Sequence, residues 1–130
     1  MKIETYDHIA VNTADIKKSE EFYKDFFGFR KLRTVENGDS TLTYMENDAG
    51  ITIELFDWHG GCSYHELTDD MAGIAHIAFK VDDIEEWYGF LKEKGADIKL
   101  PLSRLDHLGM YVVLVRVPGG AVVELCRNID

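Results

Sequence analysis

The chain has 130 residues, of which 45% are hydrophobic and 29% are charged, an ordinary balance for one globular domain. Its formal net charge of −10 argues against nucleic acid or an anionic membrane as a partner, because both need a basic face. No apolar run reaches the roughly 18 residues that span a bilayer, and the opening MKIETYDH has no apolar signal segment. We therefore expect a cytoplasmic protein.

One ten-residue phrase occurs twice, as DHIAVNTADI in residues 7–16 and as AHIAFKVDDI in residues 75–84. Five of the ten positions are identical, which is more than unrelated segments usually share. Each copy has a histidine at its second position, His8 in the first and His76 in the second. The repeat predicts that the chain consists of two related modules.

A helical pattern follows each copy of the phrase, with apolar residues three and four positions apart. Asp15 is placed to cap the first helix, and Asp82 with Glu85 is expected to form a capping box at the second. Gly28 and Gly95 are expected to end the two helices in the left-handed conformation.

Beyond each glycine the apolar period changes to two, which is typical of strands. Three strands are predicted in each half: FRKLRTV, TLTYMEN and ITIELFD, then ADIKLP, MYVVLVRV and AVVELCR. Each half is thus a strand, a helix and three strands, so we expect an α+β fold of two tandem βαβββ modules. Module 1 is expected at about 1–57, a Gly-rich linker at about 58–72 and module 2 at about 73–130.

The last predicted strand of each module carries a glutamate among apolar neighbours, Glu54 in ITIELF and Glu124 in AVVELC. A buried carboxylate needs a cation, a hydrogen-bond network or water, because an unpaired buried charge is costly. If the first and fourth strands of each module pair, His8 lies beside Glu54 and His76 lies beside Glu124. Two imidazoles and two carboxylates brought together form a divalent-metal site with room for two waters.

Simpler explanations of these residues remain open at this stage. A single strand histidine is commonly a packed side chain, and a strand glutamate commonly pairs with a base such as Arg116 or Arg127. The occurrence of all four residues in duplicate register favours metal binding. Imidazole mixed with carboxylate suits zinc, nickel, cobalt, iron or manganese.

The chain resembles the vicinal oxygen chelate superfamily, also called the glyoxalase, bleomycin resistance and dioxygenase superfamily, over essentially its whole length. The likeness rests on HIAVNTADIKKSEEFYKDFFGF, GIAHIAFKVDDIEEW and VPGGAVVEL. It implies curved mixed sheets that form a cup around a metal, with the two modules coming from one chain or from two. It also implies a homodimer, since members of this length commonly build their sites across a two-fold interface.

Within the superfamily the chain is most similar to glyoxalase I (lactoylglutathione lyase), and this likeness implies one divalent metal, nickel or zinc being favoured. The implied ligands are His8, Glu54, His76 and Glu124. The implied activity is a lyase of methylglyoxal detoxification, which converts a hemithioacetal into a 2-hydroxyacyl thioester through a metal-stabilised enediolate. Glu124 is expected to be the catalytic base, with Glu54 serving the opposite face of the substrate.

Two positions depart from bacterial glyoxalase I, which commonly has an arginine four residues after the first histidine and an asparagine four after the first glutamate. Both are associated with glutathione, and here they are Asn12 and Trp58. A different thiol adduct, or another small-molecule substrate with adjacent oxygens, therefore stays open. The alternatives are a methylmalonyl-CoA epimerase-like isomerase, a fosfomycin-modifying enzyme and a metal-free drug-binding resistance protein.

Four other polar side chains are weaker candidates for contact with a substrate. His59 and His65 lie in the linker, where a solvated surface is the usual role. Arg104 and His107 lie in PLSRLDHLGM, a segment expected to be an exposed loop.

Overall fold

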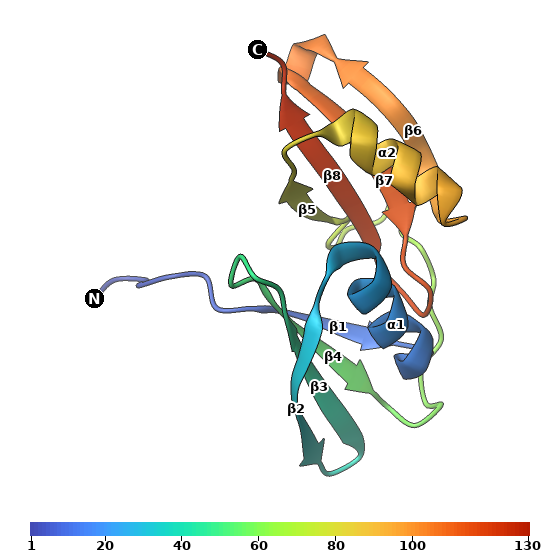
Figure 1. Ribbon diagram of the computed structural model, residues 1–130. Coiled ribbons are helices and arrows are strands. Elements are labelled where there is room, and N and C mark those ends of the chain that lie inside the picture. The colour runs from blue at the N-terminus through green and yellow to red at the C-terminus, as the bar shows by residue number, and fades with distance from the viewer. The chain divides into compact units, whose positions relative to one another are not determined.

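The computed structural model describes residues 1–130, and they divide into two units, each built on a four-stranded mixed sheet (Figure 1). Unit 1 comprises residues 1–65 with the turn 118–120, and unit 2 comprises 66–117 with 121–130. Unit 1 contains β1 (Ile9–Thr13), α1 (Ile16–Phe27), β2 (Arg30–Asn37), β3 (Ser40–Glu46) and β4 (Thr52–Asp57). Unit 2 contains β5 (Ile77–Lys80), α2 (Ile84–Glu93), β6 (Asp97–Leu105), the short 3-10 helix η1 (Asp106–Leu108), β7 (Met110–Arg116) and β8 (Val122–Asn128).

The two sheets have the same strand order, β1-β4-β3-β2 in unit 1 and β5-β8-β7-β6 in unit 2. The first strand of each sheet runs parallel to the fourth, and all other neighbours are antiparallel. The α+β fold of two βαβββ modules is therefore confirmed, as is the pairing of first and fourth strands on which the site prediction depends.

The helix ends follow the sequence signals with one exception. Asp15 caps α1 by accepting a hydrogen bond from the backbone N–H of Lys18, and Gly28 ends this helix in the left-handed conformation, as predicted. The predicted cap of α2 at Asp82 is wrong, because Asp83 has the extended backbone of an N-cap and accepts from the N–H of Glu86. The Asp82 carboxylate accepts from the N–H of Asp83 instead.

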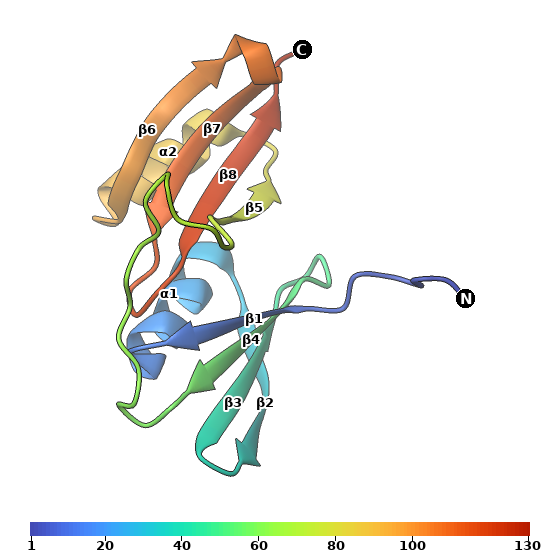
Figure 2. The ribbon, with the colours of Figure 1, turned by 180° about the vertical axis from the view of Figure 1, so that it is seen from behind.

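Alternation along the strands gives each sheet one face buried against its helix. In unit 1 the side chains of Ile53 and Leu55 are fully buried, as is Tyr23 of α1, whereas Glu54 between them points to the other face. In unit 2, α2 lies across β6, β7 and β8 (Figures 1 and 2), and Val123 and Leu125 of β8 are buried. The opposite face of each sheet is the one that carries the glutamate.

The segment that follows Pro101 differs from its prediction, because β6 continues to Leu105 where an exposed loop was expected. Its pairing with β7 is irregular between Ile98 and Leu100 and between Leu100 and Ser103. These irregularities leave Pro101, which has no N–H, outside the regular ladder. None of the helices has the length and hydropathy that crossing a membrane would need.

Candidate functional site

The first predicted pair is formed at the parallel edge of the sheet in unit 1. Ala10 of β1 stands in register with Glu54 of β4, and His8, two residues before Ala10, belongs to the same face. His8 Nε2 lies 3.5 Å from Glu54 Oε2. The Glu54 side chain is only 8% exposed, whereas His8 is 33% exposed, so the pair is open to solvent on the imidazole side. The predicted neighbour relation of His8 and Glu54 is met diagonally rather than by directly opposed residues.

Asp7 holds the other nitrogen of His8, a contact that the sequence analysis did not identify. Its Oδ2 lies 2.6 Å from His8 Nδ1. A carboxylate on Nδ1 fixes the proton there and leaves Nε2, the atom that faces Glu54, as a lone-pair donor. The acid directly before the histidine was the available signal, but the second copy of the phrase has Ala75 at that position, so the repeat did not point to it.

Tyr44 is a second residue that the sequence analysis missed. It stands opposite Glu54 in the β3–β4 register, and its ring meets His8 edge-on with 6.3 Å between centroids. The hydrogen bond to the Glu54 carboxylate raises the pKa of Tyr44, and partial desolvation adds to the shift, so the phenol stays protonated and donates. The Arg33 guanidinium lies 4.3 Å from the centroid of the same ring. Glu54 is thus held by a hydroxyl as well as facing an imidazole.

The second predicted pair forms in unit 2 in the equivalent register. Ala78 of β5 stands beside Glu124 of β8, and His76 Nε2 lies 3.1 Å from Glu124 Oε2. The residue opposite Glu124 in β7 is Leu114, where unit 1 has Tyr44. Both members are more exposed than in unit 1, with 38% of His76 and 17% of Glu124 accessible.

Neither Arg116 nor Arg127 neutralises a predicted glutamate ligand, which removes one of the two simpler explanations left open by the sequence. Arg116 donates to Glu66 and Asp97, at 2.7 and 3.1 Å, and Arg127 donates to the backbone carbonyl of Asp82. The basic side chain that lies next to each glutamate is its histidine.

The distance between the imidazole nitrogen and the carboxylate oxygen of each pair suits two ligand atoms that bind the same first-row metal ion. Bonds of about 2.1 Å to nitrogen and oxygen place neighbouring ligand atoms roughly 3.0 Å apart at a right angle and roughly 3.4 Å apart at a tetrahedral angle. The separations of 3.1 and 3.5 Å fall at these values. No group of three or more His, Cys, Asp or Glu side chains is gathered to hold a metal ion by itself. Each unit therefore presents one imidazole and one carboxylate, half of the predicted ligand set.

A cavity of about 330 Å³ adjoins His76 in unit 2. Its walls include Leu114 and Val122 from the sheet, Lys99 of β6, and residues of the segment 67–75 that precedes β5. In Figure 2 this segment, coloured yellow-green, passes over β7 and β8. The cavity has the size of a small-molecule site and includes one predicted metal ligand.

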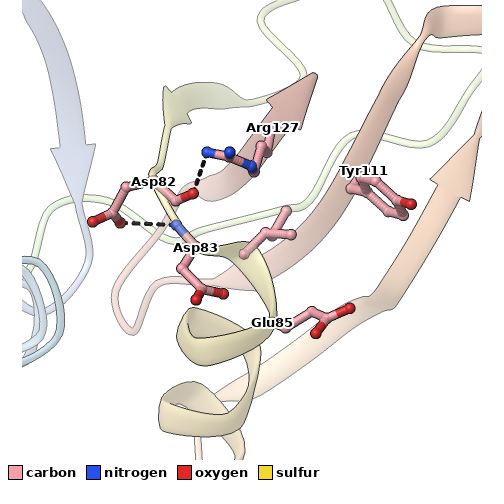
Figure 3. A pocket seen from close by; sticks show the side chains of 6 residues that line it. Asp82, Asp83, Glu85, Tyr111 and Arg127 are labelled. Atoms are coloured by element: carbon pink, nitrogen blue, oxygen red, sulfur yellow. Dashed lines mark hydrogen bonds between the residues drawn. The ribbon is translucent and has the colours of Figure 1, made fainter. Parts of the chain in front are cut away.

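A second cleft in unit 2, of about 270 Å³, lies at the start of α2 (Figure 3). It is lined by Asp82, Asp83, Ile84, Glu85, Tyr111 and Arg127. None of the four predicted ligands reaches it, and the guanidinium of Arg127 is directed at the Asp82 carbonyl (Figure 3). This cleft is therefore not part of the candidate site.

Asn12 and Trp58, the two departures from the glyoxalase I pattern, contact each other in unit 1. Trp58 Nε1 donates a 2.8 Å hydrogen bond to Asn12 Oδ1, and the indole stacks on Phe56 with 5.8 Å between centroids. The amide oxygen and the indole N–H are thus paired with each other.

The four weaker candidates are placed as surface residues. Arg104 lies in β6 and is held by Asp106 and the Tyr111 hydroxyl, at 2.7 and 3.0 Å. His107 lies in η1 and is exposed. His59 is within hydrogen-bond distance of Thr41 in unit 1, and His65 is within hydrogen-bond distance of Ser63. His65 also lines a cleft of about 300 Å³ with Asn12, Ala14, Cys62, Ser63 and Tyr64.

The fold consists of two βαβββ units, and each carries a His–Glu pair on the sheet face opposite its helix. These features define a class of protein, and sequence comparison identifies that class. Residues 5–125 match the family described as the Glyoxalase/Bleomycin resistance protein/Dioxygenase superfamily. The chain belongs to this superfamily, which confirms the resemblance drawn from the sequence.

Within this superfamily, the chain is similar over most of its length to individual proteins that have names or solved structures. The chain is 29% identical to a Vibrio parahaemolyticus protein named "Probable lactoylglutathione lyase", over 93% of this chain and 88% of that one. It is 28% identical to the "Lactoylglutathione lyase" of Haemophilus influenzae, over 93% of this chain and 90% of that one. Among solved structures, a glyoxalase family protein from Enterococcus faecalis superposes with a TM-score of 0.83 at 26% identity, covering 98% of this chain and 100% of that one.

Proposed function

We propose that the chain is a metal-dependent lyase of the glyoxalase I type, which converts a hemithioacetal of methylglyoxal into a 2-hydroxyacyl thioester. The observation that carries the proposal is the duplicated pair, His8 with Glu54 and His76 with Glu124. Within each pair the imidazole Nε2 lies next to the carboxylate Oε2, and the two pairs occupy equivalent positions in their own sheets. The names of the relatives support the same reaction class.

The four residues of the two pairs are the proposed ligands of one divalent metal, nickel or zinc being favoured over cobalt, manganese and iron. Each pair supplies one imidazole nitrogen and one carboxylate oxygen, so two half-sites, of one chain or of two, complete the set. When bound, the metal would polarise the substrate oxygens and stabilise the negative charge that develops on them.

Glu124 is the proposed base, which takes the proton from C1 of the substrate and returns it to C2. A metal-bound carboxylate is a poor base, so the catalytic glutamate must be able to leave the metal. Glu124 meets this need better than Glu54, because Leu114 opposite it offers no hydrogen bond, whereas Tyr44 tethers Glu54. Glu54 is assigned mainly to holding the metal and, as a second role, to serving the opposite face of the substrate.

The thiol that forms the hemithioacetal is proposed to bind without the arginine and asparagine contacts that the resemblance associates with glutathione. The positions that carry arginine and asparagine in bacterial glyoxalase I are Asn12 and Trp58 here, and they satisfy each other through a 2.8 Å hydrogen bond. Neither offers a cation to a carboxylate of glutathione.

The assembly is proposed to be a cytoplasmic homodimer. Met1, Ile3 and Tyr6 expose large apolar side chains in the N-terminal segment, a surface that a second copy would cover. Sedimentation of the purified protein measures the assembly directly, and a monomer at micromolar concentration would contradict it.

The proposed reaction is tested by loading purified protein with nickel, zinc, cobalt or manganese and measuring thioester formation from methylglyoxal with glutathione and with other thiols. We expect metal-dependent turnover that Glu124→Gln lowers by about 10³-fold and that Glu93→Gln, an exposed acid on α2, leaves intact. Protein that binds none of these metals and forms no thioester would point instead to a ligand-binding member of the superfamily. Turnover that survives Glu124→Gln would refute Glu124 as the base.

A further inference from the structure

A carboxylate from the segment before β5 lies between two cations of the sheet in unit 2. Glu66 Oε1 is 2.5 Å from Lys99 Nζ, and Glu66 Oε2 accepts a 2.7 Å hydrogen bond from Arg116 Nε. Arg116 also donates from Nη1 to Asp97 at 3.1 Å. The hydrogen bonds from Lys99 and Arg116 lower the pKa of Glu66, so its carboxylate is charged at neutral pH. The two cations thus present separate donors to the two oxygens of one carboxylate.

Lys99 also lines the cavity that contains His76. The same cavity is walled by apolar side chains, Leu67 and Met71 from the segment above and Leu114 from the sheet. A ligand in this space therefore meets a predicted metal ligand, His76, an apolar surface and Lys99, whose ammonium group is held by Glu66.

The contacts of Glu66 are of a kind that a ligand can replace. About a quarter to two fifths of each side chain is exposed: 27% of Glu66, 31% of Lys99 and 39% of Arg116. Ion pairs this accessible contribute little net stability. Glu66 lies in a stretch without helix or strand, so its displacement breaks no backbone ladder.

We propose that Lys99 and Arg116 form a subsite for a carboxylate of the substrate, which Glu66 occupies while the protein is free. The inference rests on the proposed function for the reacting end of the substrate at His76 and Glu124, and it adds the chemical class of the other end: a thiol arm that bears a carboxylate. A carboxylate is favoured over phosphate because the present occupant is a two-oxygen group with one oxygen on each cation.

The subsite is tested by NMR titration with 3-(methylthio)propionate and with its neutral counterpart 3-(methylthio)propan-1-ol. We expect Lys99→Met to weaken binding of the acid at least about fivefold and Glu66→Gln to tighten it several-fold, because the first removes a cation and the second removes the competing anion. Binding of the alcohol stays unchanged in both variants. Lys18→Met, an exposed lysine of α1, is the matched control, and thermal melting checks that each variant is folded.

The opposite signs of the two substitutions separate a binding role from a structural one. If Glu66→Gln leaves the affinity for the acid unchanged or lowers it, or if Lys99→Met has no effect, the subsite is refuted. Inorganic phosphate that binds more tightly than the acid refutes the assignment to carboxylate.

Failure of the subsite is distinguishable from failure of the proposed function, because the titration needs no turnover. In the kinetic arm, the hemithioacetals of methylglyoxal with 3-mercaptopropionate and with 2-mercaptoethanol are compared. Lys99→Met is expected to raise KM for the first adduct only. Turnover of both adducts with an unchanged KM ratio in the variant would leave the lyase proposal standing and overturn the subsite.

Discussion

The two units hold the same pair of side chains in different surroundings. In unit 1, Glu54 is 8% exposed and accepts a hydrogen bond from Tyr44, and its partner His8 is oriented by Asp7. In unit 2, Glu124 is 17% exposed and stands opposite Leu114, and Ala75 takes the place of Asp7. A pair that is tethered at both ends suits the holding of a metal, and a pair that is not suits the movement of a proton.

The largest difference is expected between the two glutamates. Glu124→Gln removes the proposed base and should lower kcat by about 10³-fold, within the range that general acid–base groups contribute. Glu54→Gln should act mainly through metal affinity, so that part of its loss is recovered at high metal concentration. Steady-state kinetics across a metal titration measure both effects. If both substitutions lower kcat equally, and if high metal concentration restores kcat equally in both, the two glutamates have the same role.

Metal binding should stabilise the fold, because an ion that binds only the native protein shifts the unfolding equilibrium. At a free metal concentration near a hundred times Kd, we expect Tm to rise by on the order of 10 °C. His76→Ala should abolish most of this rise, whereas His107→Ala, in η1, should keep it. Differential scanning calorimetry with and without zinc provides the measurement, and a Tm that is insensitive to every metal tested contradicts the proposed ligand set.

Asp7→Asn tests the orientation of His8 in unit 1. Loss of the carboxylate on Nδ1 should weaken metal binding by roughly tenfold, the lower end of the effect of such partners. Asp25→Asn, an exposed acid of α1, is the control for the change in net charge. The affinity is read from competition with a coloured chelator, and an unchanged Kd would mean that Asp7 is only a surface contact.

Tyr44→Phe should give the smallest effect, a loss of metal affinity of less than about tenfold. The pKa of Tyr44 is raised in the folded protein, so its contribution to stability is present below the unfolded value near 10 and is lost as pH rises through the folded pKa. Wild-type stability should therefore fall above about pH 10 more steeply than that of Tyr44→Phe. Urea unfolding at pH 8 to 11 makes the comparison, and parallel curves would exclude the hydrogen bond to Glu54.

The duplicated phrase was sufficient to predict the fold only together with the helical pattern and the three strand patterns that follow each copy, because these repeat in the same order in both halves. The repeat also predicted which histidine lies next to which glutamate, since both residues of a pair lie on the sheet face opposite the helix. The N-cap of α2 was missed because Asp82 and Asp83 are both good caps, and only the backbone conformation distinguishes them. The extension of β6 was missed because pairing with β7, rather than local propensity, carries the strand past Pro101.

The residues around the two His–Glu pairs were harder to predict from the sequence than the pairs themselves. Tyr44 reaches Glu54 through the β3–β4 register, which depends on a turn whose length the strand pattern does not specify. Glu66 finds Lys99 and Arg116 through an irregular segment that has no periodicity to interpret. Such contacts join residues distant along the chain, and they are where the two halves of an otherwise repeated sequence diverge.

X-ray absorption spectroscopy of the cobalt-loaded protein tests the proposed ligand set most directly. The ligand set predicts a shell of nitrogen and oxygen alone, two imidazole signatures for each bound ion, and the loss of one signature in His8→Ala and in His76→Ala. Sulfur in the shell, a spectrum without imidazole, or a spectrum unchanged by either substitution would contradict it.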